Sequence, residues 1–126
     1  MTENKKTILI VDDDRLILRG FTRLLERKGY MVTAVETGRD GLNQIESKNF
    51  DAALVDMRLP DMESTELLPA IRKKSPTTVK IVFTGSPDLE SLNHGKRKDI
   101  DAFLIKAINP EVILSILEQK INHKKD

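Results

Sequence analysis

TILIVDDD, residues 7–14, joins a short and largely β-branched segment directly to three consecutive acids. The apolar part does not alternate with polar residues, which is typical of a strand buried on both faces of a sheet. In open parallel sheets, ligands bind beyond the carboxyl ends of the strands. The stretch therefore predicts a parallel sheet with a polar site at one edge.

Four further apolar segments resemble the first, and each is expected to be a strand buried on both faces. They lie at residues 31–35, 52–55, 80–83 and 102–105. Between them, apolar residues recur at helical intervals, as at Leu67, Leu68 and Ile71. Alternating strands and helices form right-handed crossovers with helices on both faces of the sheet. We therefore predict an α/β chain with a doubly wound five-stranded parallel sheet in a three-layer sandwich.

Turn and capping residues agree with these elements at several points. Gly29 is expected to end the first helix in a left-handed conformation, and Asp14 to cap its start. Residues 109–111, Asn-Pro-Glu, predict the start of the last helix. Pro69 should make its helix start late or kink, and the polar segment 86–99 predicts only a short helix.

Size and composition restrict the class of protein. The 126 residues predict a single domain over residues 1–126 with flexible ends at 1–6 and 123–126. A net charge of +1 gives no reason to expect direct binding to nucleic acid, and no apolar run approaches the ~20 residues of a membrane span. The chain has no cysteine, which agrees with a reducing compartment, so a cytoplasmic protein is expected.

Chemically reactive side chains follow four of the five predicted strands. Their positions are Asp12, Asp13 and Asp14, then Asp56, then Thr84, then Lys106. Each alone is compatible with an ordinary cap or a solvated surface group, but together they converge on one edge of the sheet. Carboxylates in contact repel one another unless a cation or proton lies between them. Mg²⁺ suits such a site because it takes one or two protein carboxylates, keeps several waters and accepts phosphate oxygens.

These residues resemble the receiver domains of two-component response regulators. The resemblance rests on ILIVDD at 8–13, LVDMRLPDM at 54–62, FTG at 83–85 and FLIK at 103–106 with Asn-Pro at 109–110, and it covers nearly the whole chain. It implies a flavodoxin-like fold with strand order 2-1-3-4-5. It also implies a signalling domain rather than an enzyme, which assists only its own phosphorylation and dephosphorylation.

The resemblance implies roles for the acids at the edge of the sheet. Asp56 would be the phosphoacceptor, and Asp12 and Asp13 would bind Mg²⁺ or Mn²⁺ together with Asp56. The backbone carbonyl of Arg58 would be a further metal ligand. A carboxylate nucleophile beside a divalent cation is suited to phosphoryl transfer.

It also implies a switch. Thr84 and Lys106 would bind the phosphoryl oxygens, and Phe103 would turn inward as Thr84 moves. The surface of the fourth helix, fifth strand and fifth helix would then be remodelled. The implied partners are a sensor histidine kinase or a histidine phosphotransfer protein, an unknown downstream protein target and, in some members, a second copy in a phosphorylation-dependent homodimer.

Two alternatives remain open beside the phosphorylated receiver. An aspartyl-nucleophile phosphohydrolase typically has a second acid two residues after the nucleophile, and Arg58 at that position argues against it. A pseudo-receiver, which binds partners without phosphorylation, is favoured by departures from the family pattern. Receivers commonly have Pro at the position of Ala107, and Gly at those of Ser64 and Asp99, while Gly85 replaces a usual Ala.

Overall fold

The computed structural model describes residues 5–62, 64–85, 100–105 and 109–123. The helix expected within residues 86–99 lies outside them, and so do residues 1–4 and 124–126 of the ends expected to be flexible at 1–6 and 123–126. The described elements are β1 (Thr7–Val11), α1 (Arg15–Arg27), β2 (Met31–Val35), α2 (Gly38–Ser47), β3 (Ala52–Asp56), α3 (Ser64–Lys74), β4 (Val79–Thr84), β5 (Ala102–Ile105) and α5 (Pro110–His123). No described helix has the length and apolar character to cross a membrane.

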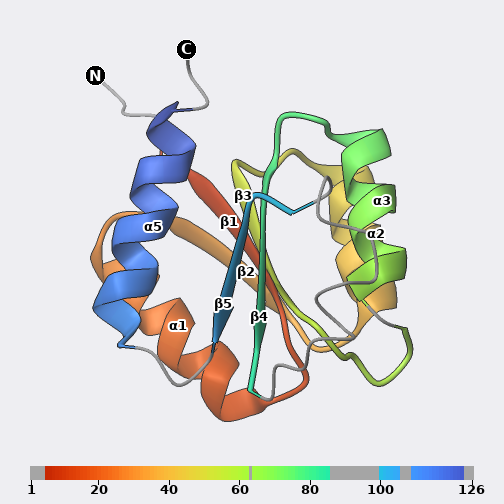
Figure 1. Cartoon of the computed structure of the whole chain (residues 1–126), viewed down its shortest axis with the longest axis horizontal. Helices are drawn as coiled ribbons and strands as arrows, with labels where there is room; N and C mark the ends of the chain where they lie inside the picture. The colour runs from red at the N-terminus through yellow and green to blue at the C-terminus, as the bar shows by residue number, and fades with distance from the viewer. Residues whose placement is uncertain (1–4, 63, 86–99, 106–108, 124–126) are drawn as a thin grey trace.

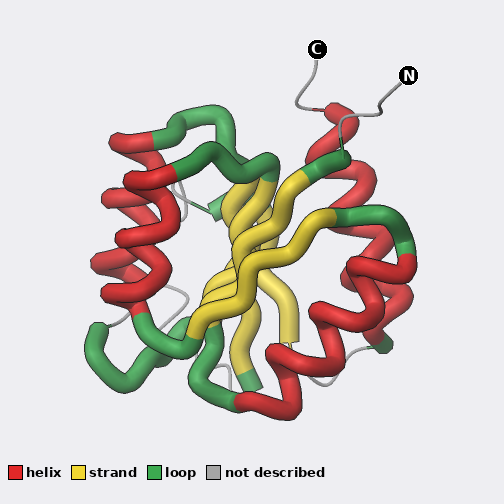
Figure 2. The backbone as a smooth tube through the Cα atoms, turned by 180° about the vertical axis from the view of Figure 1, so that it is seen from behind, coloured by secondary structure: helices red, strands yellow, loops and turns green. Residues whose placement is uncertain are grey.

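The five strands form one parallel sheet in the order β2-β1-β3-β4-β5, which confirms the predicted topology. Helices α1 and α5 cover one face, and α2 and α3 cover the other (Figure 1). Seen from behind, the strands form the central layer between the two pairs of helices (Figure 2). The three-layer sandwich expected from the alternating segments is therefore present.

The central strands are buried on both faces because each contributes to two separate cores. In β1, Ile8 and Ile10 pack in the core that includes Phe21 of α1, whereas Leu9 and Val11 pack in the core on the opposite face. All four side chains are fully buried. This explains why the first strand has no alternation of apolar and polar residues.

Two sequence expectations are corrected. β2 is an edge strand and is not buried on both faces, since Met31 is 55% exposed and Ala34 is also exposed. The helix containing Pro69 was expected to start late or kink, and the late start is wrong, because α3 begins at Ser64 and continues through the proline. Pro69 has no N–H for the carbonyl four residues before it, so α3 tolerates one missing helical hydrogen bond.

The predicted caps are confirmed. Gly29 has a φ of 98° directly after the cap of α1, a conformation that glycine adopts without steric strain. At the start of α1, the Asp14 side chain accepts hydrogen bonds from the backbone N–H groups of Leu16 and Ile17. The Asn109 side chain accepts one from the Glu111 N–H at 2.8 Å, and α5 begins at Pro110 between them.

Candidate functional site

Three of the predicted acids meet at the carboxyl edge of the sheet. Asp12 follows β1 and Asp56 ends β3, and the pairing of Val11 with Val55 puts these two acids level on neighbouring strands. One carboxylate oxygen from each of Asp12, Asp13 and Asp56 lies within 4.8 Å of the others. Asp12 and Asp56 are buried, whereas Asp13 is exposed. We call these three residues the acidic cluster.

Asp14, the last of the three consecutive acids, does not belong to the acidic cluster. Its side chain caps α1, while its backbone N–H donates a 2.9 Å hydrogen bond to Asp12 Oδ1. This bond orients the buried Asp12 carboxylate at the end of the strand. Of the three consecutive acids, Asp14 therefore caps the helix, and Asp12 and Asp13 belong to the acidic cluster.

Asp56 is held by the end of β3 and the neighbouring strand β4. The N–H of Met57 donates to the Phe83 carbonyl at 3.0 Å, and the N–H of Arg58 makes a long 3.5 Å contact with Asp56 Oδ1. Thr84, the last residue of β4, is also buried at this edge of the sheet. A carboxylate and a hydroxyl thus follow one another along the carboxyl edge, as expected.

The remaining predicted residues lie on or beyond β5. Phe103 is partly buried and packs against the core under α2 and α3. The pairing of Thr84 with Ile105 places the end of β5 beside the end of β4. Lys106, which follows, and Ala107 lie outside the described residues, as does Asp99.

The acidic cluster has the chemistry of a divalent-cation site. Two carboxylates ~4 Å apart repel by ~1 kcal/mol in water and by ~4 kcal/mol at an effective dielectric near 20. A cation among the oxygens replaces this repulsion with attraction, and oxygen-only ligands select a hard ion such as Mg²⁺. Because Asp13 is exposed while Asp12 and Asp56 are buried, the acidic cluster reaches the surface of the protein.

Comparison with known proteins agrees with this arrangement. The model of the response regulator receiver domain family matches residues 8–118. The chain belongs to this family. A solved receiver from Methanospirillum hungatei JF-1, described as CheY-like, is 39% identical with a TM-score of 0.92, and the match covers 97% of this chain and 98% of that one. The BeF3-activated DrrB receiver domain is 29% identical with a TM-score of 0.85, covering 94% and 99% of the two chains.

Among curated proteins, the DNA-binding transcriptional regulator NtrC of Proteus hauseri is 30% identical over 122 residues. The match covers 97% of this receiver but only 26% of NtrC. Similarity therefore extends through one part of a much longer regulator. What the rest of NtrC does is not carried over to this chain by the match.

The loop after β3 of this receiver makes a contact with α2 that the sequence did not predict. Asp61 accepts hydrogen bonds from the first two N–H groups of α2, those of Gly38 at 2.8 Å and Arg39 at 2.9 Å. These two hydrogen bonds, with smaller help from the Arg39 charge, lower the pKa of the exposed Asp61 carboxyl. Near Asp61 in the sequence, nothing beyond an acid after Pro60 pointed to this contact. The two N–H groups that donate to Asp61 lie more than twenty residues earlier.

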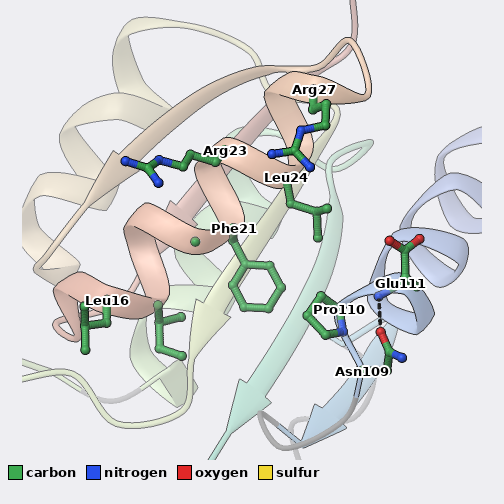
Figure 3. Close-up of a pocket in the computed structure, with 10 residues that line it drawn as sticks. Leu16, Phe21, Arg23, Leu24, Arg27, Asn109, Pro110 and Glu111 are labelled. Atoms are coloured by element: carbon green, nitrogen blue, oxygen red, sulfur yellow. Dashed lines mark hydrogen bonds between the residues drawn. The ribbon is translucent and has the colours of Figure 1, made fainter.

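An apolar groove lies away from the acidic cluster, between α1 and the start of α5 (Figure 3). Its volume is about 520 Å³. Figure 3 shows Phe21 and Leu24 of α1 opposite Pro110, with Arg23 and Arg27 along the same helix. The groove holds none of the three clustered acids, so it is a surface separate from the acidic cluster.

Proposed function

We propose that this receiver accepts a phosphoryl group from a phosphohistidine donor on Asp56, with Mg²⁺ bound at the acidic cluster, and changes its surface in response. The observation that best supports this proposal is the position of Asp56 at the end of a buried strand. One of its carboxylate oxygens lies within 4.8 Å of carboxylate oxygens of two further acids. Mn²⁺ has the same preference for oxygen ligands and is expected to substitute for Mg²⁺.

In this proposal the acidic cluster and the backbone hold the cation. Asp12, Asp13 and Asp56 would supply carboxylate oxygens, and Arg58 would supply its backbone carbonyl. A cation held there would supply positive charge that offsets the negative charge on the phosphoryl oxygens during transfer. The hydrogen bond from the Asp14 N–H fixes the Asp12 carboxylate beforehand, so less reorganisation is needed when the cation enters.

Transfer to Asp56 would proceed by direct displacement. One Asp56 oxygen forms a bond to phosphorus while the bond from phosphorus to the donor's imidazole nitrogen breaks. The electron pair stays with the imidazole, which takes up a proton. The burial of Asp56 limits access of water to the resulting acyl phosphate.

The response would come from residues on β4 and β5. Added phosphoryl charge of about −1.5 to −2 attracts donors, and the Thr84 hydroxyl and the Lys106 ammonium are the proposed ones. Phe103, which is only partly buried, would turn toward the space that Thr84 leaves and alter the surface around β5 and α5. A bias of a few kcal/mol between two existing states is sufficient for such a switch.

The proposed partners follow from this chemistry. A sensor histidine kinase or a histidine phosphotransfer protein would supply the phosphoryl group, and a downstream protein or a second copy of the chain would recognise the altered surface. The 29% identical receiver described as BeF3-activated supports activation by a compound that is close to a phosphoryl group in shape and charge. No phosphohydrolase role is proposed, because Arg58 stands where such enzymes typically have a second acid.

Intact-mass spectrometry tests the proposal. The parent, Asp56→Asn and the control Asp40→Asn, which changes an exposed acid on α2, are incubated with acetyl phosphate with and without Mg²⁺. The parent and the control should gain one phosphoryl mass only with Mg²⁺, and Asp56→Asn should gain none. No gain in the parent under any condition would favour the pseudo-receiver instead.

A further inference from the structure

The first turn of α2 is capped by two side chains from different parts of the chain. Thr37, the N-cap residue, accepts a hydrogen bond from the Asp40 N–H at 3.1 Å. Asp61 accepts the hydrogen bonds of the two preceding N–H groups, one with each carboxylate oxygen. The N–H groups of the first three helical residues, 38–40, have no acceptor within the helix. Asp61 accepts two of these three hydrogen bonds.

A steric contact reinforces this cap. The Met62 side chain packs over Gly38, and a Cβ at Gly38 would lie 2.6 Å from Met62 Sδ and still closer to Met62 Cγ. The N–H of Leu59 donates to the Met62 carbonyl at 3.1 Å and closes the loop on itself. Residues 57–62 are therefore attached to α2 both by hydrogen bonds and by packing.

The same loop begins at the acidic cluster. Asp56 is the last residue of β3, and the Met57 N–H is held by the Phe83 carbonyl. Asp61 follows five residues after Asp56, so the loop is held at β4 on one side and at α2 on the other. Arg58, whose backbone carbonyl is the proposed metal ligand, lies between these two attachment points.

We propose that Asp61 is a positioning residue for the cation site: by holding the loop against α2, it sets the place of the Arg58 carbonyl beside the acidic cluster. The inference rests on the proposed function, because it assigns Asp61 a role at the same site. It touches neither metal nor phosphoryl group. Its effect on Mg²⁺ is that of an outer residue which orients a ligand.

The direct test compares Mg²⁺ affinity in Asp61→Asn and Asp40→Asn by calorimetry at a temperature where all variants are folded. Both substitutions remove one negative charge beside the first turn of α2, but only Asp61 joins that turn to the loop. Removing an outer positioning group weakens metal binding by about 10-fold or more. We expect the Kd to rise about tenfold in Asp61→Asn, by that precedent, and to stay at the parent value in Asp40→Asn.

A role in stability alone would give a different result. Asp61→Asn would then melt at a lower temperature yet bind Mg²⁺ with the parent Kd, and that outcome would overturn the inference. Equal weakening in Asp40→Asn would also overturn it, because loss of charge and not loss of the attachment would explain the effect. Faster amide hydrogen exchange at Gly38 and Arg39 in Asp61→Asn is expected as well.

Gly38→Ala approaches the same attachment from the other side. The new Cβ would displace Met62 and should weaken Mg²⁺ binding, whereas the control Gly20→Ala on α1 meets nothing within 4 Å and should not. If Gly38→Ala and Asp61→Asn both bound Mg²⁺ with the Kd of the parent, the attachment of the loop to α2 would have no role in cation binding.

These results separate the inference from the proposed function. A parent that binds Mg²⁺ but gains no phosphoryl group would contradict the proposed function and leave the affinity comparison valid. A parent that binds no Mg²⁺ would contradict both.

Discussion

Acids at the two edges of the sheet have opposite surroundings: those at the amino edge lie next to hydrogen-bond donors, and those at the carboxyl edge lie next to one another. At the amino edge, Asp51 Oδ2 accepts a hydrogen bond from the Thr7 N–H at 2.8 Å. There the buried Lys80 donates from Nζ to the Thr78 carbonyl at 2.9 Å, and Nζ lies 3.7 Å from the Asp101 carboxylate. At the carboxyl edge, three carboxylates lie within 4.8 Å of one another.

The two edges differ in how the negative charge of their acids is compensated. Each acid at the amino edge faces a donor, so its negative charge is compensated locally and the contact stabilises the folded chain. In the acidic cluster like charges lie close together, an arrangement that costs stability unless a cation or a proton lies between them. Substitutions at the amino edge should therefore lower stability and leave cation binding unchanged, whereas substitutions in the acidic cluster should weaken cation binding and, without the cation, raise stability.

The largest effect is expected at the acidic cluster. Asp13→Asn should raise the Kd for Mg²⁺ by about 100-fold, because the attraction between opposite charges ~4 Å apart is ~1 to ~4 kcal/mol between water and a protein surface. Calorimetric titration measures the change. An unaltered Kd would show that Asp13, although close to the other two acids, is not part of the cation site.

The next effect concerns stability at the amino edge. Asp51→Ala leaves the partly buried Thr7 N–H without its acceptor and should lower the free energy of unfolding by about 2 kcal/mol. Urea denaturation measures this loss, and Asp51→Asn, which keeps an oxygen acceptor, should restore most of it. Mg²⁺ affinity should not change; if it did, the two edges would not be independent.

A smaller effect of opposite sign is expected from Asp13→Asn without Mg²⁺. Removing one of three neighbouring charges should raise the free energy of unfolding by about 1 kcal/mol, since the exposed Asp13 repels its neighbours mainly through water. With saturating Mg²⁺ the order should reverse, because only the parent gains the full stabilisation of the bound cation. A less stable variant in both conditions would mean that the clustered acids do not repel one another.

The smallest effect is the pH dependence at Asp61. Its pKa in the folded chain is lowered from the ordinary 3.8 by hydrogen bonds from the Gly38 and Arg39 N–H groups. The carboxylate therefore contributes its stability above pH 3.8, and this contribution is lost as the pH falls through the lowered pKa. The difference in Tm between parent and Asp61→Asn should narrow below this pH, and a constant difference down to pH 3 would contradict the assignment.

Patterns that depend on neighbouring residues could be predicted from the sequence. The central strands were evident because both their faces are apolar, and the site because acids directly follow strands whose carboxyl ends meet. Asp14 was predicted as a cap from its position before an apolar periodic segment, and the structure confirms it. The proposed roles of the acidic cluster remain predictions.

Features that depend on distant partners could not be predicted in this way. The attachment of Asp61 to α2 joins residues more than twenty positions apart, and neither helix propensity nor apolar spacing records such a pair. The burial of Lys80 depends on the Thr78 carbonyl and on Asp101 from the next strand. The exposure of β2 is a different case, because the strand order 2-1-3-4-5 that the resemblance implied already places this strand at an edge, and only the apolar character of residues 31–35 suggested burial on both faces.

The most direct test of the central claim is to locate the phosphoryl group. After phosphorylation with acetyl phosphate and Mg²⁺, borohydride reduces an aspartyl phosphate to homoserine, which peptide mass spectrometry places in the sequence. We predict homoserine at position 56 alone, and only when Mg²⁺ was present. Homoserine at position 12 or 13, or labelling that does not require the cation, would contradict Asp56 as the phosphoacceptor of the acidic cluster.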